Sequence, residues 1–298
     1  MKKVLVAGST GYLGRYVVQE LRQRGYWIRA LVRNTDKIKL PGPHLEPAIA
    51  PLVDEFFVGE ATRPPTIADA CNGVDVVFSS LGMTRPDFVH TAFDVDYHAN
   101  LNLLRFAMKA GVKKFVYVSV YQAHRMMEIQ NIQAHEKFVD ELRASGIEYA
   151  VIRPTGYFSD MAQFLAMARN GVMLSLGDGD KRSNPIHGAD LARVCVDAIE
   201  GTDNVVEAGG PETFTYREVA EMAAEIAGKK PFTASLPTWL ADGVAAVAGL
   251  VNRDIQDIAL FASAVSKMDS IAPPHGSHKL RDYFIDISKQ EGHEGDTL

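Results

Sequence analysis

The chain has 298 residues, of which 47% are hydrophobic and 23% are charged, and its formal net charge is -6 at pH 7. These values are typical of a globular protein that is long enough to bury most of its apolar surface. The negative charge and the lack of a Lys or Arg run argue against nucleic acid as the main ligand, because neutralising phosphates requires clustered cations.

Membrane, secretory and metal-binding classes are also disfavoured. The longest apolar stretch, residues 239–251, is interrupted by Asp242 and is shorter than the ~20 residues of a transmembrane helix. The apolar residues 4–7 are too few for a signal peptide, so we expect a cytoplasmic protein. Cys71 and Cys195 do not make a disulfide framework and are expected to be buried free thiols. Metal-ligand spacing is not seen, so no metal is predicted.

Strand and helix signals alternate along the first half of the chain. Apolar runs rich in β-branched residues predict strands at 3–7, 27–32, 56–58, 74–79, 114–119 and 149–153. Helical spacing of apolar residues predicts helices at 11–24, 66–71, 94–110 and 130–145, and four prolines predict a loop over 38–53. This alternation predicts an α/β fold with a doubly wound parallel sheet, the Rossmann fold, with right-handed crossovers.

The pattern is looser after Pro154. Helices are predicted at 160–170, 190–200, 215–227 and within 236–267, with a short strand at 205–208, and Thr215 and Glu218 have capping-box spacing. We therefore expect a dinucleotide-binding core at 1–155. A mostly helical C-terminal part at 156–287 is expected to complete the sheet and form the substrate pocket, and the polar residues 288–298 are expected to be disordered.

Three glycines follow the first strand at a regular spacing: Gly8, Gly11 and Gly14. Glycine permits positive φ in a tight turn, close approach of a pyrophosphate, and close packing of the helix on the sheet. The N–H groups at the helix start then bind phosphate. The motif in this context predicts a dinucleotide site. Its residues are Gly8, Ser9, Thr10, Gly11, Tyr12, Leu13 and Gly14. The alternative is a turn that persists in a protein without a cofactor.

Arg33 follows the second strand, at the position that discriminates between the two nicotinamide cofactors. NAD sites usually place an acid here for the ribose 2′-hydroxyl, whereas NADP sites use an arginine that grips the 2′-phosphate in a bidentate fork. Arg33 therefore predicts NADP as the cofactor, with NADPH preferred over NADH. The alternative is an ordinary solvated arginine.

Several segments resemble the extended and atypical short-chain dehydrogenase/reductases. Residues 6–14, VAGSTGYLG, resemble their nucleotide turn, residues 75–80 their fourth strand, and residues 113–119 their fifth strand. Residues 153–156, RPTG, resemble the segment that touches the nicotinamide end, and residues 184–192 resemble a structural motif. The resemblance covers residues 2–230 and implies that Ser80, Leu81 and Pro154 contact the cofactor.

The resemblance also implies catalytic residues, with one departure. Active members carry Ser followed by Tyr-x-x-x-Lys, in which Lys lowers the pKa of Tyr and Tyr delivers a proton. Ser119 and Lys137 match this pattern, and Lys137 would also bind the nicotinamide ribose, but Gln133 replaces the tyrosine. An amide is not a general acid. Tyr121 is a substitute phenol or, alternatively, a packed aromatic, and Tyr157 is a second phenol that would face a substrate. His124 and His135 are candidates for proton transfer, but each is expected to be a surface or satisfied histidine because no partner is visible in the sequence.

The chain thus resembles atypical members that lack the tyrosine: NmrA-like proteins, isoflavone-reductase-like enzymes and divinyl chlorophyllide reductases. The first hypothesis is an NADPH-dependent oxidoreductase that reduces a C=C or C=O bond of a hydrophobic small molecule. The second is a cofactor-binding redox sensor or assembly protein without turnover, which an apolar surface on residues 236–267 would favour. A nucleotide-sugar epimerase is weaker because of Gln133. We expect a monomer or a homodimer.

Overall fold

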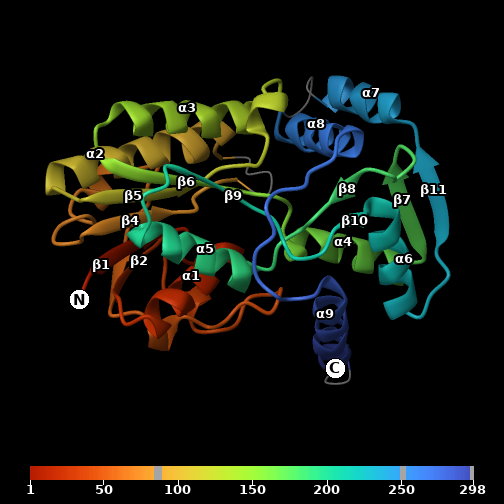
Figure 1. Ribbon diagram of the computed structural model, residues 1–298, viewed down its shortest axis with the longest axis horizontal. Helices are drawn as coiled ribbons and strands as arrows, with labels where there is room; N and C mark the ends of the chain where they lie inside the picture. The colour runs from red at the N-terminus through yellow and green to blue at the C-terminus, as the bar shows by residue number, and fades with distance from the viewer. Residues whose placement is uncertain (84–88, 249–252, 296–298) are drawn as a thin grey trace. The chain divides into compact units, whose positions relative to one another are not determined.

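The computed structural model describes residues 1–83, 89–248 and 253–295 (Figure 1). The chain divides into two compact units, the first formed by Met1–Arg153 and Leu191–Glu207 and the second by Pro154–Asp190 and Ala208–Leu298. The boundary expected at residue 155 lies close to this division, but residues 191–207 return to the first unit. Ion pairs of Arg24 with Asp197 (2.5 Å) and of Lys2 with Glu200 (2.6 Å) hold that returning segment.

The first unit contains a seven-stranded sheet in the order β3-β2-β1-β4-β5-β6-β9. Its strands are β1 (Lys3–Ala7), β2 (Trp27–Val32), β3 (Glu55–Val58), β4 (Val76–Ser79), β5 (Lys114–Val118), β6 (Glu148–Pro154) and β9 (Val205–Ala208). The pairs from β3 through β6 are parallel, which confirms the predicted doubly wound sheet. The strand order reverses between β1 and β4, and such a switch point is where α/β proteins bind ligands.

Helices cover both faces of this sheet. Figure 1 shows α2 (Asn100–Ala110) and α3 (Gln130–Ala144) on one face, and α1 (Tyr12–Gln23) and α5 (Gly188–Glu200) on the other. The core under α2 and α3 includes the buried side chains Leu104, Phe115, Tyr117 and Phe138. Because these apolar side chains recur at helical or alternating positions, the sequence pattern specifies which face of each element is buried.

Two predicted helices differ from the structure. The helix expected at 66–71 is a single 3-10 turn at Pro64–Ile67, because Gly73, with φ of 71°, turns the chain into β4 too soon for an α-helix. The helix expected at 94–110 begins with a wider π-helical segment, Phe93–Ala99, and becomes α-helical only in α2.

The second unit combines helices with short strands. Its elements after β6 are α4 (Phe158–Arg169), β7 (Val172–Leu176), β8 (Arg182–Ser183), β10 (Phe214–Thr215), α6 (Tyr216–Ile226), β11 (Phe232–Leu236), α7 (Thr238–Ala248), α8 (Arg253–Lys267) and α9 (Leu280–Gly295). The predicted capping box is confirmed, since Thr215 accepts a hydrogen bond from the Glu218 N–H and the Glu218 carboxylate accepts one from the Thr215 N–H. Helix α9 extends through residues 288–295, so the tail expected to be disordered is helical there, and residues 296–298 lie outside the described residues.

The helical region predicted at 236–267 corresponds to α7 and α8, with residues 249–252 outside the described part of the chain. Several large apolar side chains of these two helices are exposed, namely Trp239, Val247, Ile255, Ile258 and Phe261. Within the described ranges, every helix is too short or too polar to cross a bilayer.

Candidate cofactor and active site

The glycine turn lies between β1 and α1, as the sequence predicts. Gly8 has φ of 83°, the N–H of Gly11 donates to the carbonyl of Gly8 at 3.0 Å, and Gly11 is the N-cap of α1. A Cβ atom at Gly8 would lie 2.7 Å from the Oγ of Ser80, and one at Gly14 would lie 2.0 Å from the Gly8 carbonyl oxygen. The backbone geometry therefore requires glycine at both positions.

The other residues of the turn make contacts within the protein. Ser9 is buried and its hydroxyl donates to the carbonyl of Leu31 at 3.1 Å, while Leu13 is buried in the core. Thr10 accepts a hydrogen bond from Arg15 at 3.2 Å, and the Tyr12 ring packs edge-on against Tyr16. The first N–H groups of a helix have no intrahelical acceptor, and Gly11 offers no side-chain cap. The helix start therefore favours a phosphate.

Arg15 connects the proline-containing loop to this turn through hydrogen bonds, and no sequence motif predicts this contact. Its guanidinium donates to the carbonyls of Leu40 and Pro47, both at 2.9 Å, although the side chain is buried. Burial lowers the pKa of Arg15, and the charge of Glu46 opposes this effect. The only signal in the sequence is a charged residue on the apolar face of the predicted helix.

Arg33 is exposed at the carboxyl end of β2, next to β1 in the sheet. Within the residues that the structure describes, its guanidinium makes no hydrogen bond or ion pair. An arginine in this place is available to bind a phosphate on the β2 side of the glycine turn.

Ser80 and Leu81 follow β4, and Ser80 lies against Gly8. At the last residue of β4, the Ser79 hydroxyl donates to the side-chain oxygen of Asn100 at 2.6 Å. The amide nitrogen of Asn100 donates to the Leu81 carbonyl at 3.2 Å. Both Ser79 and Asn100 are fully buried. This polar pair shapes the end of β4, and its only signal in the sequence is an asparagine on an apolar helix face.

Ser119 follows β5 and is paired with Glu136. Its Oγ donates to Oε1 of Glu136 at 2.7 Å, and Arg153 of β6 donates to both carboxylate oxygens at 2.9 and 2.7 Å. Arg153 also donates to the Val120 carbonyl at 3.0 Å. Burial acts to raise the pKa of Glu136, but the hydrogen bonds from Arg153 and Ser119 lower it overall, so the carboxylate is ionised at neutral pH.

Lys137 lies elsewhere on α3. Its side chain is exposed, and its Nζ is 4.5 Å from the centre of the Tyr97 ring and 5.7 Å from that of Phe93. Successive helical residues point about 100° apart, so Glu136, not Lys137, faces Ser119. The structure therefore does not pair Ser119 with Lys137, and the catalytic role of Lys137 stays a prediction.

The remaining sequence-predicted residues occupy the ends of strands and helices. Tyr121 is half-buried just after β5, and Pro154 is the buried last residue of β6. The side-chain amide of Gln133 donates to the Met127 carbonyl at 2.7 Å. The roles of Tyr121 in catalysis and of Pro154 in cofactor binding stay predictions.

A second polar network links α3 to β5 and to the π-helical segment. Nε2 of His135 lies 2.9 Å from Oδ1 of Asp96, and Nδ1 of the same ring lies 2.6 Å from the hydroxyl of Tyr117. Burial, with a contribution from the charge of Asp96, raises the pKa of Tyr117 well above its usual value, so the phenol is neutral. His135 is thus a satisfied histidine, but its partners lie far apart in the sequence.

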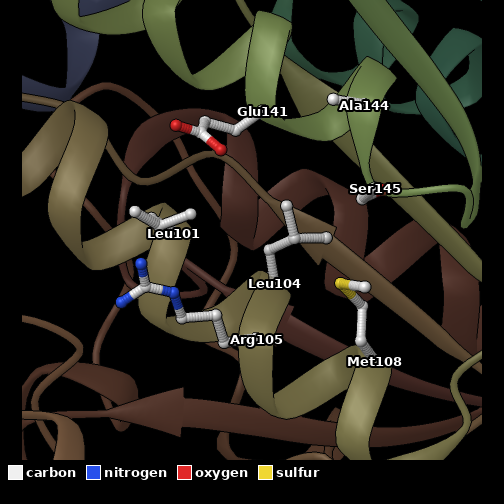
Figure 2. Close-up of a pocket in the computed structure, with 7 residues that line it drawn as sticks. All are labelled: Leu101, Leu104, Arg105, Met108, Glu141, Ala144 and Ser145. Atoms are coloured by element: carbon white, nitrogen blue, oxygen red, sulfur yellow. The ribbon is translucent and has the colours of Figure 1, made fainter.

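A pocket of about 230 Å³ lies between α2 and α3 (Figure 2). It is lined by Leu101, Leu104, Arg105, Met108, Glu141, Ala144 and Ser145. None of the sequence-predicted site residues lines this pocket, and Glu141 also accepts a hydrogen bond from Tyr97 at 2.9 Å. This pocket is therefore separate from the glycine turn and from the hydrogen-bonded residues Ser119, Glu136 and Arg153.

Comparison with known proteins supports the nucleotide-binding interpretation. A family model described as NAD(P)H-binding matches residues 8–202. The chain is 31% identical to the divinyl chlorophyllide a 8-vinyl-reductase, chloroplastic, of Zea mays over 99% of this chain and 81% of that protein. It is 24% identical to the photosystem II assembly factor Ycf39 of Trieres chinensis over 88% of this chain and 82% of that protein.

A solved structure has the same fold. The NADPH-dependent quinone oxidoreductase of Escherichia coli, complexed with NADPH, superposes with a TM-score of 0.71 at 22% identity, over 97% of this chain and 99% of that chain. Because the Zea mays relative is chloroplastic by name, the cytoplasmic location expected from the sequence stays a prediction, as does the oligomeric state.

Proposed function

Since this chain belongs to the NAD(P)H-binding family of atypical short-chain dehydrogenase/reductases, we propose that it is an NADPH-dependent reductase. Its substrate would be a hydrophobic small molecule with a reducible C=C or C=O bond. The observation that carries the proposal is the glycine turn, which is closed to any side chain at Gly8 and Gly14 and lies beside the start of α1. Such a turn fits a pyrophosphate.

The preference for NADPH rests on Arg33. This cation lies at the end of β2, where an NAD site usually has a carboxylate for the ribose 2′-hydroxyl. A guanidinium without a protein partner among the described residues is suited to a 2′-phosphate, which it can bind through two parallel hydrogen bonds.

The chemistry of the Zea mays relative supports a C=C bond as the target, because its name describes a vinyl reductase. In such a reduction, NADPH supplies a hydride to one carbon and an acid supplies a proton to the other, giving the saturated product and NADP⁺. Ser119 donates its own proton to an ionised Glu136, so it is suited to orient a ligand by accepting a hydrogen bond. The proton would then come from Tyr121 or from water.

The experiment is a titration of the purified protein with NADPH and NADH, with Arg33→Ala as the test variant. We expect NADPH to bind more tightly than NADH, and Arg33→Ala to weaken NADPH binding about 10–100-fold without changing NADH binding. Arg63→Ala is the matched control, because Arg63 is a largely exposed arginine whose ion pair is with Glu60, at 3.1 Å. Equal affinity for the two cofactors would refute the NADPH preference.

Turnover is then assayed by the loss of NADPH absorbance with hydrophobic substrates that carry a vinyl group or a quinone. Oxidation of NADPH that depends on such a substrate supports the reductase. Binding of NADPH without turnover of any of them would favour the second candidate, a cofactor-binding assembly factor. The exposed Trp239, Val247 and Ile258 and the similarity to Ycf39 support that candidate.

A further inference from the structure

The turn that follows β4 is held by a buried carboxylate. The N–H of Met83 donates to both side-chain oxygens of Asp96, at 3.2 and 3.1 Å. The side-chain amide of Asn131 donates both to the Met83 carbonyl and to Oδ1 of Asp96, each at 3.3 Å. A Cβ atom at Gly82 would lie 2.9 Å from the same Oδ1, so only glycine fits comfortably at this point of the turn.

Asp96 is in turn oriented by His135. The Asp96 side chain is completely buried, and the His135 side chain is only 11% exposed. Because Nε2 of His135 faces the carboxylate, that nitrogen carries the proton, and Nδ1 of the neutral ring accepts the proton of the Tyr117 hydroxyl.

Residues 80–83 lie on the β4 side of the glycine turn. In the sheet, β2 with Arg33 lies on one side of β1, and β4 lies on the other. A dinucleotide whose pyrophosphate lies at the glycine turn therefore places its adenosine half toward β2 and its nicotinamide half toward β4 and β5. Ser80, the first residue of the turn, lies against Gly8, so residues 80–83 lead from the pyrophosphate toward the nicotinamide half.

We propose that Asp96, oriented by His135, is a positioning residue that holds residues 80–83 in the shape that binds the nicotinamide half of NADPH. The inference rests on the proposed function, since it requires NADPH as the ligand. Asp96 acts through the backbone of Met83 and does not touch the reacting atoms. His135 acts one step further away, by fixing the carboxylate.

The test compares NADPH with adenosine 2′,5′-bisphosphate, which has the 2′-phosphate and the adenosine but no nicotinamide. We expect Asp96→Asn to weaken NADPH binding about tenfold or more, because an amide NH₂ would face an N–H donor in the network. Binding of the bisphosphate should be unchanged, since it uses the glycine turn and Arg33. A residue with only a structural role would lower both affinities together.

Two further variants keep the test decisive if Asp96→Asn does not fold. His135→Gln retains a donor for Asp96 and should weaken NADPH binding less than His135→Leu, again with bisphosphate binding unchanged. His124→Leu is the matched control, because His124 is exposed and precedes α3, and it should bind both ligands like the wild type. Thermal unfolding of each variant shows that the compared proteins are folded.

The outcomes separate the inference from the proposed function. If the wild type binds both ligands but the variants bind both with equally reduced affinity, or bind both as tightly as the wild type, the positioning role is overturned while the NADPH site of the proposed function stands. If the wild type binds neither ligand, the proposed function fails and the inference fails with it.

Discussion

The hydroxyl of Ser119 donates its proton to Glu136 across 2.7 Å, and the adjacent helical residue, Lys137, points to the Tyr97 ring instead. Arg153 holds the same carboxylate through two hydrogen bonds. A hydroxyl has one proton, so Ser119 has only acceptor capacity left for a ligand. The orientation of the Ser119 hydroxyl therefore depends on Glu136 and Arg153.

Glu136→Ala is expected to lower the free energy of unfolding by about 3 kcal/mol, because it leaves the mostly buried charge of Arg153 without its partner. Urea denaturation measures the difference. Asp140→Ala is the control on the same helix, since Asp140 is 77% exposed and its ion pair with Arg143 should contribute less than about 0.5 kcal/mol. Equal losses in the two variants would contradict a strong Glu136–Arg153 pair.

The same pair predicts how stability depends on pH. The pKa of Glu136 is lowered in the folded state, so its contribution is fully present above the unfolded value of about 4.5 and is lost as the pH falls through the lower folded value. The difference in unfolding free energy between wild type and Glu136→Gln should thus be constant near neutral pH and shrink in acid. A difference that persisted through strong acid would show that the partner of Arg153 is not the ionised carboxylate.

Local patterns account for what the sequence could predict. The strands of the sheet are apolar runs, and the glycines of the turn reflect backbone requirements, so both can be identified without knowing any distant contact. The choice between Glu136 and Lys137 is different, because it depends on the rotation of α3 about its axis. Packing of Phe138 against Phe115 and Tyr117 sets that rotation, and motif spacing does not contain it.

The second unit also contains elements that local sequence patterns do not predict. Strands β7 and β11 pair with each other in parallel, from Val172 with Phe232 to Leu176 with Leu236. Each strand is short and partly exposed, so neither has a clear alternating pattern, and each depends on a partner about sixty residues away. Asp96 and His135, in the first unit, are likewise separated in the sequence, which is why the sequence does not identify the partner of His135.

Alanine substitutions in the glycine turn should give graded losses of NADPH affinity. Gly14→Ala should abolish binding, because its Cβ would overlap the backbone oxygen of Gly8 at 2.0 Å. Gly8→Ala should come next, since it combines positive φ with a 2.7 Å approach to Ser80, and Gly11→Ala should be mildest, with a 3.3 Å contact. Gly25→Ala is the control, because it has positive φ in open space and should cost about 1 kcal/mol of stability without affecting binding. Loss of affinity in Gly25→Ala would mean that backbone strain alone explains the series.

Cys71 and Cys195 should be unreactive in the folded protein. Burial raises the pKa of Cys71 to about 12 and also raises that of Cys195, and only the thiolate attacks an alkylating reagent. Mass spectrometry after treatment with iodoacetamide should show no adduct in native buffer and two adducts in denaturant. An adduct on either thiol in native buffer would contradict the burial of that residue.

Lys137 provides the clearest contrast between the role implied by the family resemblance and the role that its contacts support. Its exposed ammonium group lies over the Tyr97 ring, an arrangement worth about 0.5–1 kcal/mol. Lys137→Met keeps the aliphatic stem and removes the charge. If Lys137 has only this packing role, the variant lowers stability by no more than this amount and leaves NADPH affinity unchanged. A loss of NADPH affinity of about tenfold or more, without the same loss in Lys109→Met on the exposed face of α2, would instead place the amine on the nicotinamide ribose. Measuring both the affinity and the unfolding free energy of Lys137→Met therefore distinguishes a packing role from a cofactor-binding role.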